Sequence, residues 1–183
     1  MMLARFLGAR KAKRRGTNAT VDEETEEETL GVKQREHLSL VEGILTLFDA
    51  NQATPNNVEE LFSPNADINF TDIHMNVTDL IHETKALQES FPDLGARWDE
   101  IVPLSERDMV VIDGFVLSGT HTGQPYAFGP FPAVPTKGAF CRNDPERLVF
   151  RISCGKIQRI DILSSSEKTG PQGFYRQLGG FPL

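Results

Sequence analysis

The stretch ERLVFRISCGKIQRIDIL, residues 146–163, carries two alternating patterns of hydrophobic residues separated by a turn signal. This arrangement predicts two antiparallel strands joined by a loop at Ser153-Cys154-Gly155. Because successive side chains of a strand point to opposite faces, the hairpin has an apolar face and a charged face. The apolar face carries Leu148, Phe150, Ile152, Ile160 and Ile162. The charged face carries Arg147, Val149, Arg151, Arg159 and Asp161.

The apolar face of the hairpin is expected to line the core or a cavity, because exposing it would forfeit the main driving force for folding. Two polar residues share this face, Glu146 at its start and Gln158 near the turn. Gln158 is predicted to lie opposite Phe150, where its amide could hydrogen-bond a ligand carbonyl. Glu146 is a candidate acid or base if apolar surroundings raise its pKa.

The orientation of Asp161 depends on the register of the hairpin. The predicted pairing places it opposite Arg147 on the charged face, so its carboxylate is expected to point outward, in an ion pair with Arg147 or Arg151. A β-bulge between Gly155 and Asp161 would turn it inward, because one extra residue moves a side chain to the other face. The sequence leaves both alternatives open.

The chain before the hairpin predicts three helices. From about Lys33, hydrophobic residues recur at spacings of three and four, which predicts a core-facing helix. These residues are Leu38, Val41, Ile44, Leu45 and Phe48. The stretch ATPNNVEELF, residues 53–62, predicts a second, short helix. A third is predicted over VTDLIHETKALQESF, residues 77–91, with Thr78 or Asp79 as its cap.

Strand signals dominate the second half of the chain, from ARWDEIVPL, residues 96–104, to the hairpin. Helices followed by a meandering sheet predict an α+β fold. We expect a cone-shaped barrel in which a strongly curved antiparallel sheet wraps around about three N-terminal helices. The Pro- and Gly-rich stretch GQPYAFGPFPAVPTKG, residues 123–138, is expected at the mouth of its pocket.

Residues 1–32 differ from everything that follows them. MMLARFLGARKAKRRG, residues 1–16, has six Lys or Arg and no acid, and DEETEEE, residues 22–28, then has six acids. Neither block can build a core, so we predict a disordered tail over residues 1–32 and one domain over residues 33–183. The basic block is expected to be a solvated tail of a cytoplasmic protein, a targeting segment for an organelle or a nuclear signal.

Composition excludes several classes of function. The formal net charge of −7 argues against a nucleic-acid-binding surface. Cys141 and Cys154 match neither a disulfide framework nor a metal-binding spacing, so free thiols are expected. No apolar run reaches the roughly 18 to 20 residues of a membrane span. His74 and His82 have no third ligand in view, so no zinc site is predicted.

Several stretches together resemble the SnoaL-like polyketide cyclase branch of the nuclear transport factor 2-like superfamily. In chain order, between about Leu38 and Gly180, they are LFDANQATPNNVEELFSPNADINF, FPDL, SGTHTG, VPTKG, FRISCGKI and RQLGG. The resemblance implies a cone-shaped α+β barrel, dimeric through the outer face of its sheet, with a largely apolar cavity. In the cyclases this cavity binds a polycyclic ketone ester, and an acidic side chain mediates an intramolecular aldol closure without metal or cofactor.

The resemblance places the cyclase carboxylate at Ile162 and a cavity histidine at Leu148, and both positions are aliphatic in this chain. Asp161 misses the carboxylate position by one residue. Glu146, and His121 within SGTHTG, are the other candidates for acid–base chemistry. The iota class of carbonic anhydrase shares this fold, but RIDILSSSE has no histidine before its serines, which disfavours that activity.

Two functions therefore stay open. The first is an enzyme that acts by proton transfer on a small hydrophobic ketone, ester or polyketide-like substrate, through aldol cyclisation or isomerisation, with Asp161, Glu146 or His121 as the catalytic group. The second is a catalytically silent module of the same fold that binds an apolar ligand or forms a homodimer. Neither needs a metal or cofactor. The expected ligand-binding residues are Gln158, Phe150, Leu148, Ile160, Ile162, Trp98 and Phe70.

Overall fold

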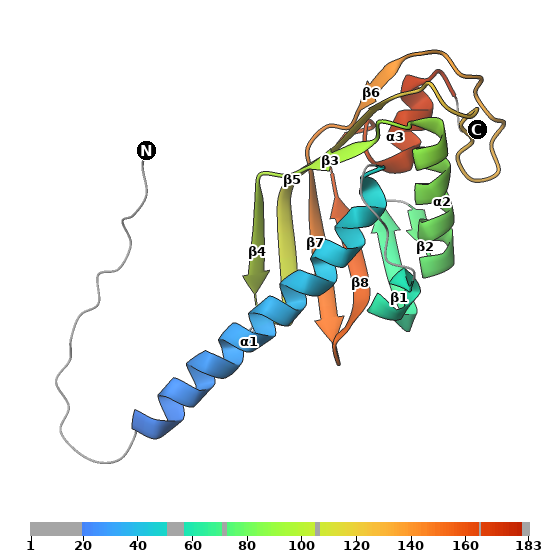
Figure 1. The fold of residues 1–183 in the computed structure, drawn as a ribbon. Coiled ribbons are helices and arrows are strands. Elements are labelled where there is room, and N and C mark those ends of the chain that lie inside the picture. Colours follow the sequence, from blue (N-terminus) through green and yellow to red (C-terminus); the bar gives the residue numbers. More distant parts are fainter. Residues whose placement is uncertain (1–19, 51–56, 71–72, 105–106, 165, 181–183) are drawn as a thin grey trace, which may run out of the picture.

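An eight-stranded sheet forms the centre of the computed structural model, which describes residues 20–50, 57–70, 73–104, 107–164 and 166–180 (Figure 1). Side chains are described from residue 31 onward. The elements in chain order are α1 (Thr20–Leu45), the 3-10 helices η1 (Thr46–Phe48) and η2 (Val58–Leu61), β1 (Phe62–Phe70), β2 (Ile73–Met75), α2 (Val77–Ser90), β3 (Gly95–Arg97), β4 (Glu100–Leu104), β5 (Met109–Thr120), β6 (Phe140–Arg142), β7 (Glu146–Ser153), β8 (Lys156–Leu163) and α3 (Gly170–Gln177).

The sheet has the strand order β2-β1-β8-β7-β5-β3, and β4 and β6 also pair with β5. The pair β1–β8 is parallel, whereas its neighbours β1–β2 and β7–β8 are antiparallel. The sheet is therefore mixed, which corrects the antiparallel sheet predicted from the sequence. Alternation could not reveal this, because parallel and antiparallel strands share the same period of two. A parallel pair needs a long connection, and α2 and six strands lie between β1 and β8 in the chain.

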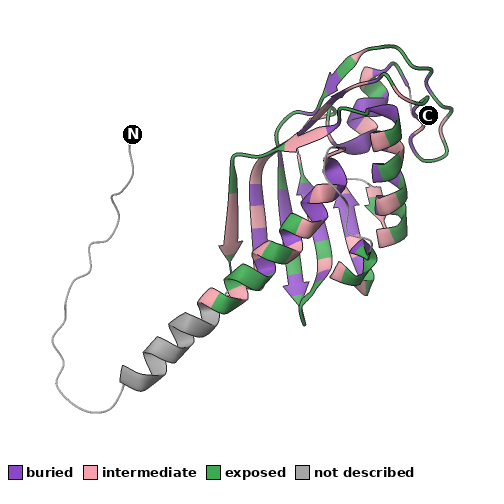
Figure 2. Ribbon diagram, in the orientation of Figure 1, coloured by how far each residue is buried: buried purple, intermediate pink, exposed green. Residues whose placement is uncertain are grey.

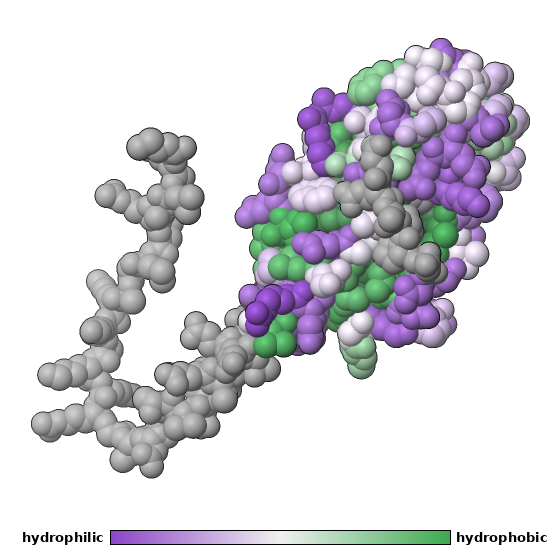
Figure 3. All heavy atoms as spheres, in the orientation of Figure 1, coloured by the Kyte–Doolittle hydropathy of each residue, from purple (hydrophilic) through white to green (hydrophobic). Residues whose placement is uncertain are grey.

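Helix α1 runs across one face of the curled sheet, and α2 and α3 lie near one another at the side where β1 and β2 end it (Figure 1). The predicted α+β cone, with helices packed against one face of a strongly curved sheet, is confirmed. Figure 3 shows hydrophobic residues gathered on the face over which α1 lies, with hydrophilic residues around them. The helices therefore enclose the apolar side of the sheet.

Helix α1 begins at Thr20, earlier than the predicted start at about Lys33. The Glu-rich stretch 22–28 suits a helix, because Glu is a good helix former. The remainder of the predicted tail, residues 1–19, lies outside the described residues. The predicted hydrophobic stripe is confirmed, since its five members are all buried or half-buried: Leu38, Val41, Ile44, Leu45 and Phe48.

The other two predicted helices differ from expectation at their starts. Within residues 57–62 the second helix is only the 3-10 helix η2, and residues 53–56 lie outside the described residues. The third is α2, which is capped by Asn76 instead of Thr78 or Asp79. The Asn76 side chain accepts a hydrogen bond from Asp79 N at 2.9 Å, and Asn76 N donates to the Asp79 carboxylate at 3.3 Å. This reciprocal capping box uses the polar residue just before the helical pattern.

The turn of the β7–β8 hairpin is shorter than predicted. Cys154 and Gly155 form a two-residue turn with φ of 51° and 67°, and Ser153 pairs with Lys156. Two positive φ values match the right-handed twist of the flanking strands in a two-residue hairpin turn. Ser153 is therefore a strand residue, which moves the register by one residue from the predicted one.

A β-bulge in β8 moves the register by a second residue. Gln158 is the extra residue, because Ile157 and Arg159 pair with consecutive residues of β7. As a result Phe150 pairs with Ile160, not with Gln158 as predicted. The two shifts add to two residues, and since alternation has a period of two, Ile160, Asp161 and Ile162 keep their predicted faces. Buried and exposed positions alternate along most of β7 and β8 (Figure 2), except at Val149, which is also buried, and at the bulge, where the buried residues Ile157 and Ile160 are three apart.

A bulge also bends β5 at Gly114, where the pairing with β7 shifts between Ile112 and Phe115. The first half of β5 pairs with β4 and β7, and its second half pairs with β3 and β6. Gly114 has a φ of +67°, and a Cβ atom there would overlap the Asp99 carboxylate. A glycine is therefore needed at the bend that lets one strand serve both parts of the sheet.

We predict that Gly114→Ala lowers the free energy of unfolding by about 2 to 3 kcal/mol, through backbone strain and the overlap with Asp99. Urea unfolding measures the loss. Gly138→Ala is the matched control, because Gly138 has a φ of +63° but open space around its Cα. It should lose only about 1 kcal/mol, the backbone strain alone. Equal losses in the two variants would contradict a contribution from the overlap between a Cβ atom at position 114 and Asp99.

Candidate functional site

Two clefts adjoin where β2, α2, α3 and the loop 121–139 meet. The first, called the α3 cleft, has a volume of about 240 Å³ and lies between Phe70, Ile162 and the first turn of α3. The second, called the α2 cleft, has a volume of about 460 Å³ and lies between β2, α2 and residues 128–131. The clefts share a mostly apolar wall of Ile73, Met75, Phe128 and Gln172. An apolar ligand lying across this wall would bury hydrophobic surface on both sides.

Glu83 of α2 lines the α2 cleft although its residue is only 7% exposed. The Tyr126 hydroxyl donates a hydrogen bond to its Oε1 at 2.6 Å, and the Gly129 backbone N–H donates another to the carboxylate. Burial raises the pKa of Glu83 above its ordinary value, although these two bonds and the nearby His82 act in the opposite direction. A carboxyl group with a raised pKa beside a cleft is a candidate general acid or base.

The Tyr126 hydroxyl has two acceptors within reach. It lies 2.6 Å from Glu83 Oε1 and 3.2 Å from the Pro171 carbonyl oxygen. When Glu83 is ionised, Tyr126 donates to it. When Glu83 is protonated, its O–H can donate to the Tyr126 oxygen, and the tyrosine proton can turn to Pro171. Glu83 can therefore take up a proton without leaving a buried polar group unpaired.

Tyr126 itself stays a hydrogen-bond donor over the ordinary pH range. It is fully buried, and burial, the charge of Glu83 and the hydrogen bond to Glu83 raise the pKa of its hydroxyl well above the usual value. Gln172 of α3 lines both clefts and adds a residue with a second kind of donor, a side-chain amide. An amide N–H can bind a ligand carbonyl oxygen.

Glu146 is buried at the start of β7, with only 3% of its residue exposed. Its Oε1 accepts hydrogen bonds from Asn143 Nδ2 at 3.1 Å and from the Gly170 backbone N–H at 2.7 Å. Burial raises the pKa of Glu146 to about 7, although both bonds act to lower it. Glu146 lines neither the α2 cleft nor the α3 cleft. Its carboxylate instead joins the start of β7 to the first residue of α3.

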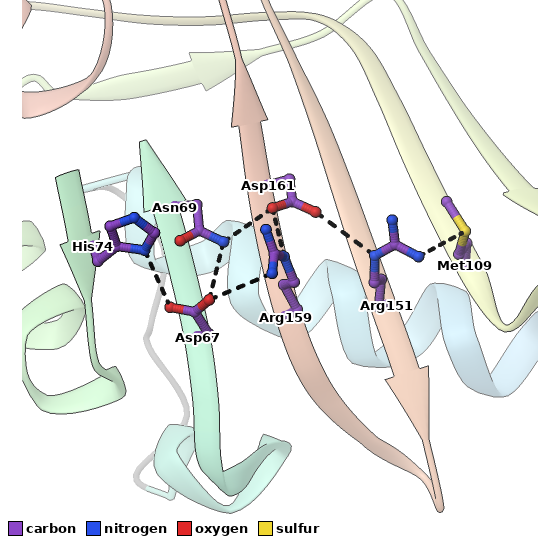
Figure 4. Close-up of polar contacts among 7 residues, drawn as sticks. All are labelled: Asp67, Asn69, His74, Met109, Arg151, Arg159 and Asp161. Atoms are coloured by element: carbon purple, nitrogen blue, oxygen red, sulfur yellow. Dashed lines mark hydrogen bonds and ion pairs between the residues drawn. The ribbon is translucent and has the colours of Figure 1, made fainter. Parts of the chain in front are cut away.

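Asp161 lies on the outer face of the sheet, opposite the face that carries α1 (Figure 4). Its carboxylate accepts a hydrogen bond from Arg159 at 2.6 Å and one from Asn69 at 3.0 Å, and lies 3.6 Å from Arg151. Partial burial would raise the pKa of Asp161, but the bonds from Arg159 and Asn69 and the charges of the two arginines hold it below its ordinary value. Asp161 therefore stays ionised and lines neither cleft.

Of the two predicted ion-pair partners of Asp161, Arg151 is confirmed and Arg147 is not. Arg147 pairs with Asp113 at 2.5 Å, and Asp161 lies opposite Val149 in the sheet. A bulge does lie between Gly155 and Asp161, but the shorter turn offsets it, so the carboxylate keeps the outward direction.

The third catalytic candidate, His121, is completely buried at the end of β5. Its ring stacks on Phe91 at a centroid distance of 5.1 Å, and its Nε2 lies 3.0 Å from the Gln124 carbonyl oxygen. Nδ1 has no hydrogen-bond partner among the described residues. The imidazole lines neither the α2 nor the α3 cleft.

The structure divides the predicted ligand-binding residues into three groups. Phe70 and Ile162 line the α3 cleft. Gln158 donates to the Ser153 carbonyl oxygen near the turn, and Trp98 lies in a separate groove beside α1. The others are core residues with at most 3% exposure that line neither cleft: Leu148, Phe150 and Ile160.

Sequence reasoning missed Glu83 and Tyr126. One signal was available for Glu83, because it lies at helical spacing between Leu80 and Leu87 on the buried stripe of α2. No comparable signal identified Tyr126, which lies in an irregular loop and meets Glu83 only in the folded chain.

The described ranges contain no group of three or more His, Cys, Asp or Glu residues that could hold a metal ion. Among the described helices, none has the length and apolar character needed to cross a membrane. Cys141 and Cys154 are both free, as the sequence predicted.

Comparison with known proteins finds no matching family model and no matching curated protein. Solved structures do match. AclR from Streptomyces galilaeus, named a "putative hydroxylase", is 18% identical over 80% of this chain and 82% of its own, with a TM-score of 0.57. A "putative SnoaL-like polyketide cyclase" from Jannaschia sp. CCS1 is 20% identical over 72% of this chain and 87% of its own, with a TM-score of 0.52.

A third solved structure is IdmH from Streptomyces antibioticus, named a "putative polyketide cyclase". It is 20% identical over 78% of this chain and 98% of its own, with a TM-score of 0.51. At these identities the matches establish a shared fold. The predicted resemblance to the SnoaL-like cyclases is confirmed at that level.

We predict that Glu146→Gln reduces the loss of stability between acid and neutral pH. The folded state raises the pKa of Glu146 from 4.5 to about 7, so its stabilising contribution is complete below about pH 4.5 and is lost as the pH rises to about 7. The shift corresponds to about 3 kcal/mol, and an amide lacks this term. Urea unfolding of both proteins at pH 5 and pH 8 measures it. Glu167→Gln is the control, because the Glu167 side chain is 92% exposed. An unchanged pH dependence in Glu146→Gln would contradict the prediction.

Proposed function

We propose that this protein binds a small hydrophobic ketone, ester or polyketide-like molecule across the α2 and α3 clefts, and that Glu83 transfers a proton to or from it. The observation that carries the proposal is the position of Glu83, a buried carboxyl group with a raised pKa beside a mostly apolar cleft. The shared fold with polyketide cyclases supports the same class of ligand by analogy.

The chemistry follows from the groups beside the cleft. Ionised Glu83 removes a proton from the carbon next to a ligand carbonyl, and the electron pair of that C–H bond forms an enolate. Gln172 lines the same cleft, and in this proposal its side-chain amide donates to the developing enolate oxygen. In an aldol closure the enolate carbon then attacks a second carbonyl, and protonated Glu83 returns its proton to the new alkoxide. In an isomerisation the proton returns to another carbon.

Glu83 fits this role better than the three groups suggested by the sequence. Asp161 faces away from the clefts in ion pairs with Arg151 and Arg159. Glu146 and His121 are buried without lining either cleft. A general base must come within hydrogen-bonding reach of the proton that it removes, so access decides among these groups before pKa does.

A second candidate function is dimerisation through the outer face of the sheet, defined as Val102, Val111 and Val149 with the ion pairs beside them. Val111 pairs with Val149 on one side and with Val102 on the other, which makes an apolar centre. The bordering pairs hold three arginines and three aspartates: Arg147–Asp113, Arg151–Asp161 and Arg159–Asp67. A two-fold axis would set such balanced charges against their opposites in a second copy.

We predict that Glu83→Gln loses proton transfer but keeps ligand binding, because the amide has nearly the same shape and cannot take a proton. A panel of hydrophobic ketones and esters is tested for binding by calorimetry and for exchange of α-protons in D2O by NMR. Exchange should fall by about 100-fold or more, while the Kd changes little. Glu89→Gln on the same helix is the control, because the Glu89 side chain is 56% exposed. Exchange that survives in Glu83→Gln would refute the catalytic role, and absence of binding across the panel would refute the ligand class.

We predict that the protein is a homodimer and that Val111→Asp makes it a monomer, because the change introduces an unpaired charge at the centre of the outer face. Analytical ultracentrifugation of both proteins over a range of concentrations measures the mass. Phe140→Asp is the matched control, since Phe140 is 65% exposed on β6. A wild-type protein that remains monomeric at all concentrations would contradict the interface.

A further inference from the structure

The first turn of α3 lacks the local cap that a helix start normally uses. Thr169 precedes the helix, but its side chain makes no capping bond and donates instead to the Ser166 carbonyl oxygen at 2.9 Å. The Gly170 N–H is bound by Glu146 from β7, at 2.7 Å. A carboxylate at this place satisfies a free backbone donor and the positive end of the helix dipole. Glu146 therefore does the work of an N-cap from a distant strand.

Asn143 holds the Glu146 carboxylate in this direction. Its Nδ2 donates to the same Oε1 at 3.1 Å, and its backbone N–H donates to the Leu117 carbonyl oxygen of β5 at 3.0 Å. Among the described residues Glu146 has no ion-pair partner, so these hydrogen bonds are its polar contacts. The carboxylate is thus fixed between β5, β7 and the start of α3.

The residue after Gly170 touches the proposed acid–base pair. The Pro171 carbonyl oxygen is the second acceptor of the Tyr126 hydroxyl, at 3.2 Å. That acceptor favours a proton on Glu83 Oε1, because Tyr126 can then accept from Glu83 and donate to the Pro171 carbonyl oxygen. Gln172, the next residue, lines both clefts. Three consecutive residues therefore connect Glu146 to the groups that surround Glu83.

We propose that Glu146 is a positioning residue: by holding Gly170 it places the Pro171 carbonyl where Tyr126 can donate to it, and so stabilises the protonated form of Glu83. The effect of Glu146 on catalysis rests on the proposed role of Glu83. The effect of Glu146 on the protonation of Glu83 depends only on the hydrogen bonds described above. It assigns to Glu146 a function in the acid–base site although its own carboxylate cannot reach a ligand.

Loss of the Glu146 carboxylate should displace the first turn of α3 without detaching the helix. Phe174 is completely buried and packs edge-to-face on Phe91 at 4.9 Å. The Tyr175 hydroxyl donates to the Pro132 carbonyl oxygen at 2.8 Å, and Lys137 Nζ donates to the Leu178 carbonyl oxygen at 2.6 Å. These contacts anchor the rest of α3 independently of Glu146.

The test measures the titration of Glu83 by the NMR shift of its side-chain carboxyl carbon in the full-length protein, without any ligand. In Glu146→Ala the midpoint should fall by about one pH unit, because the protonated form loses a hydrogen-bonded arrangement. Glu146→Gln should titrate as the wild type does, since its Oε1 can accept from Gly170 and Asn143 as the carboxylate does. Tyr126 and His82, the titratable groups that act on Glu83, are unchanged in both variants.

Glu167→Gln, three residues before Gly170, is the matched control and should leave the Glu83 midpoint unchanged, because its side chain is 92% exposed. An unchanged midpoint in Glu146→Ala, or equal shifts in Glu146→Ala and Glu146→Gln, would overturn the inference. If Glu146→Ala does not fold, the wild-type protein is used instead. The NMR shift of its Gly170 amide proton should change with pH as Glu146 titrates near pH 7. A shift that does not change with pH would overturn the contact between Glu146 and Gly170, and with it the inference.

The titration experiment and the search for a ligand can fail independently of each other. A failed search for a ligand or for proton exchange would leave the coupling between Glu146 and Glu83 intact. An unchanged Glu83 midpoint would remove the coupling and leave the ligand-binding proposal standing.

Discussion

Alternate residues of β7 from Glu146 to Ile152 are buried, as are Ile157, Ile160 and Ile162 of β8, and the rest of the structure depends on the face that they form. Leu148, Phe150 and Ile160 are at most 3% exposed in the middle of the sheet. Full burial of side chains of this kind contributes about 1.5 to 3 kcal/mol each, and a slip by one residue would replace them with arginines and Asp161. The outward direction of Asp161 is thus a consequence of the core, which no local rearrangement at the carboxylate can reverse.

The candidate site is built where the helices meet the edge of the sheet, away from the hairpin that stabilises it. Its two buried carboxyl groups, Glu83 and Glu146, have no ion-pair partner among the described residues and are held by neutral hydrogen-bond donors. Burial without a cation raises the pKa of a carboxyl group. Both groups therefore hold a proton more readily than exposed carboxylates do, which suits an acid–base function at Glu83 and a pH-sensitive contact at Glu146.

The outer face of the sheet has the opposite electrostatic character. Its arginine side chains are 45% to 57% exposed and pair with aspartates, which keeps Asp161 ionised. Ion pairs with this exposure contribute about 0 to 1 kcal/mol each. The charged network therefore adds little to the stability of one chain. In the proposed homodimer its arginines and aspartates would instead pair across the contact between two chains.

Local pattern was enough to predict the α+β class, the hydrophobic stripe of α1 and the two faces of the hairpin. It was not enough for the parallel pair β1–β8, or for the turn and the bulge, whose register shifts add to two residues and so leave Asp161 on its predicted face. At the site it identified Phe70 and Ile162 as cleft residues but not Glu83 with Tyr126. By itself the sequence determined which hairpin side chains face the core, because alternation is a property of neighbouring residues. Only the tertiary structure decided which carboxyl groups are buried beside a cleft, because burial and hydrogen bonding there come from elements that are distant in the chain.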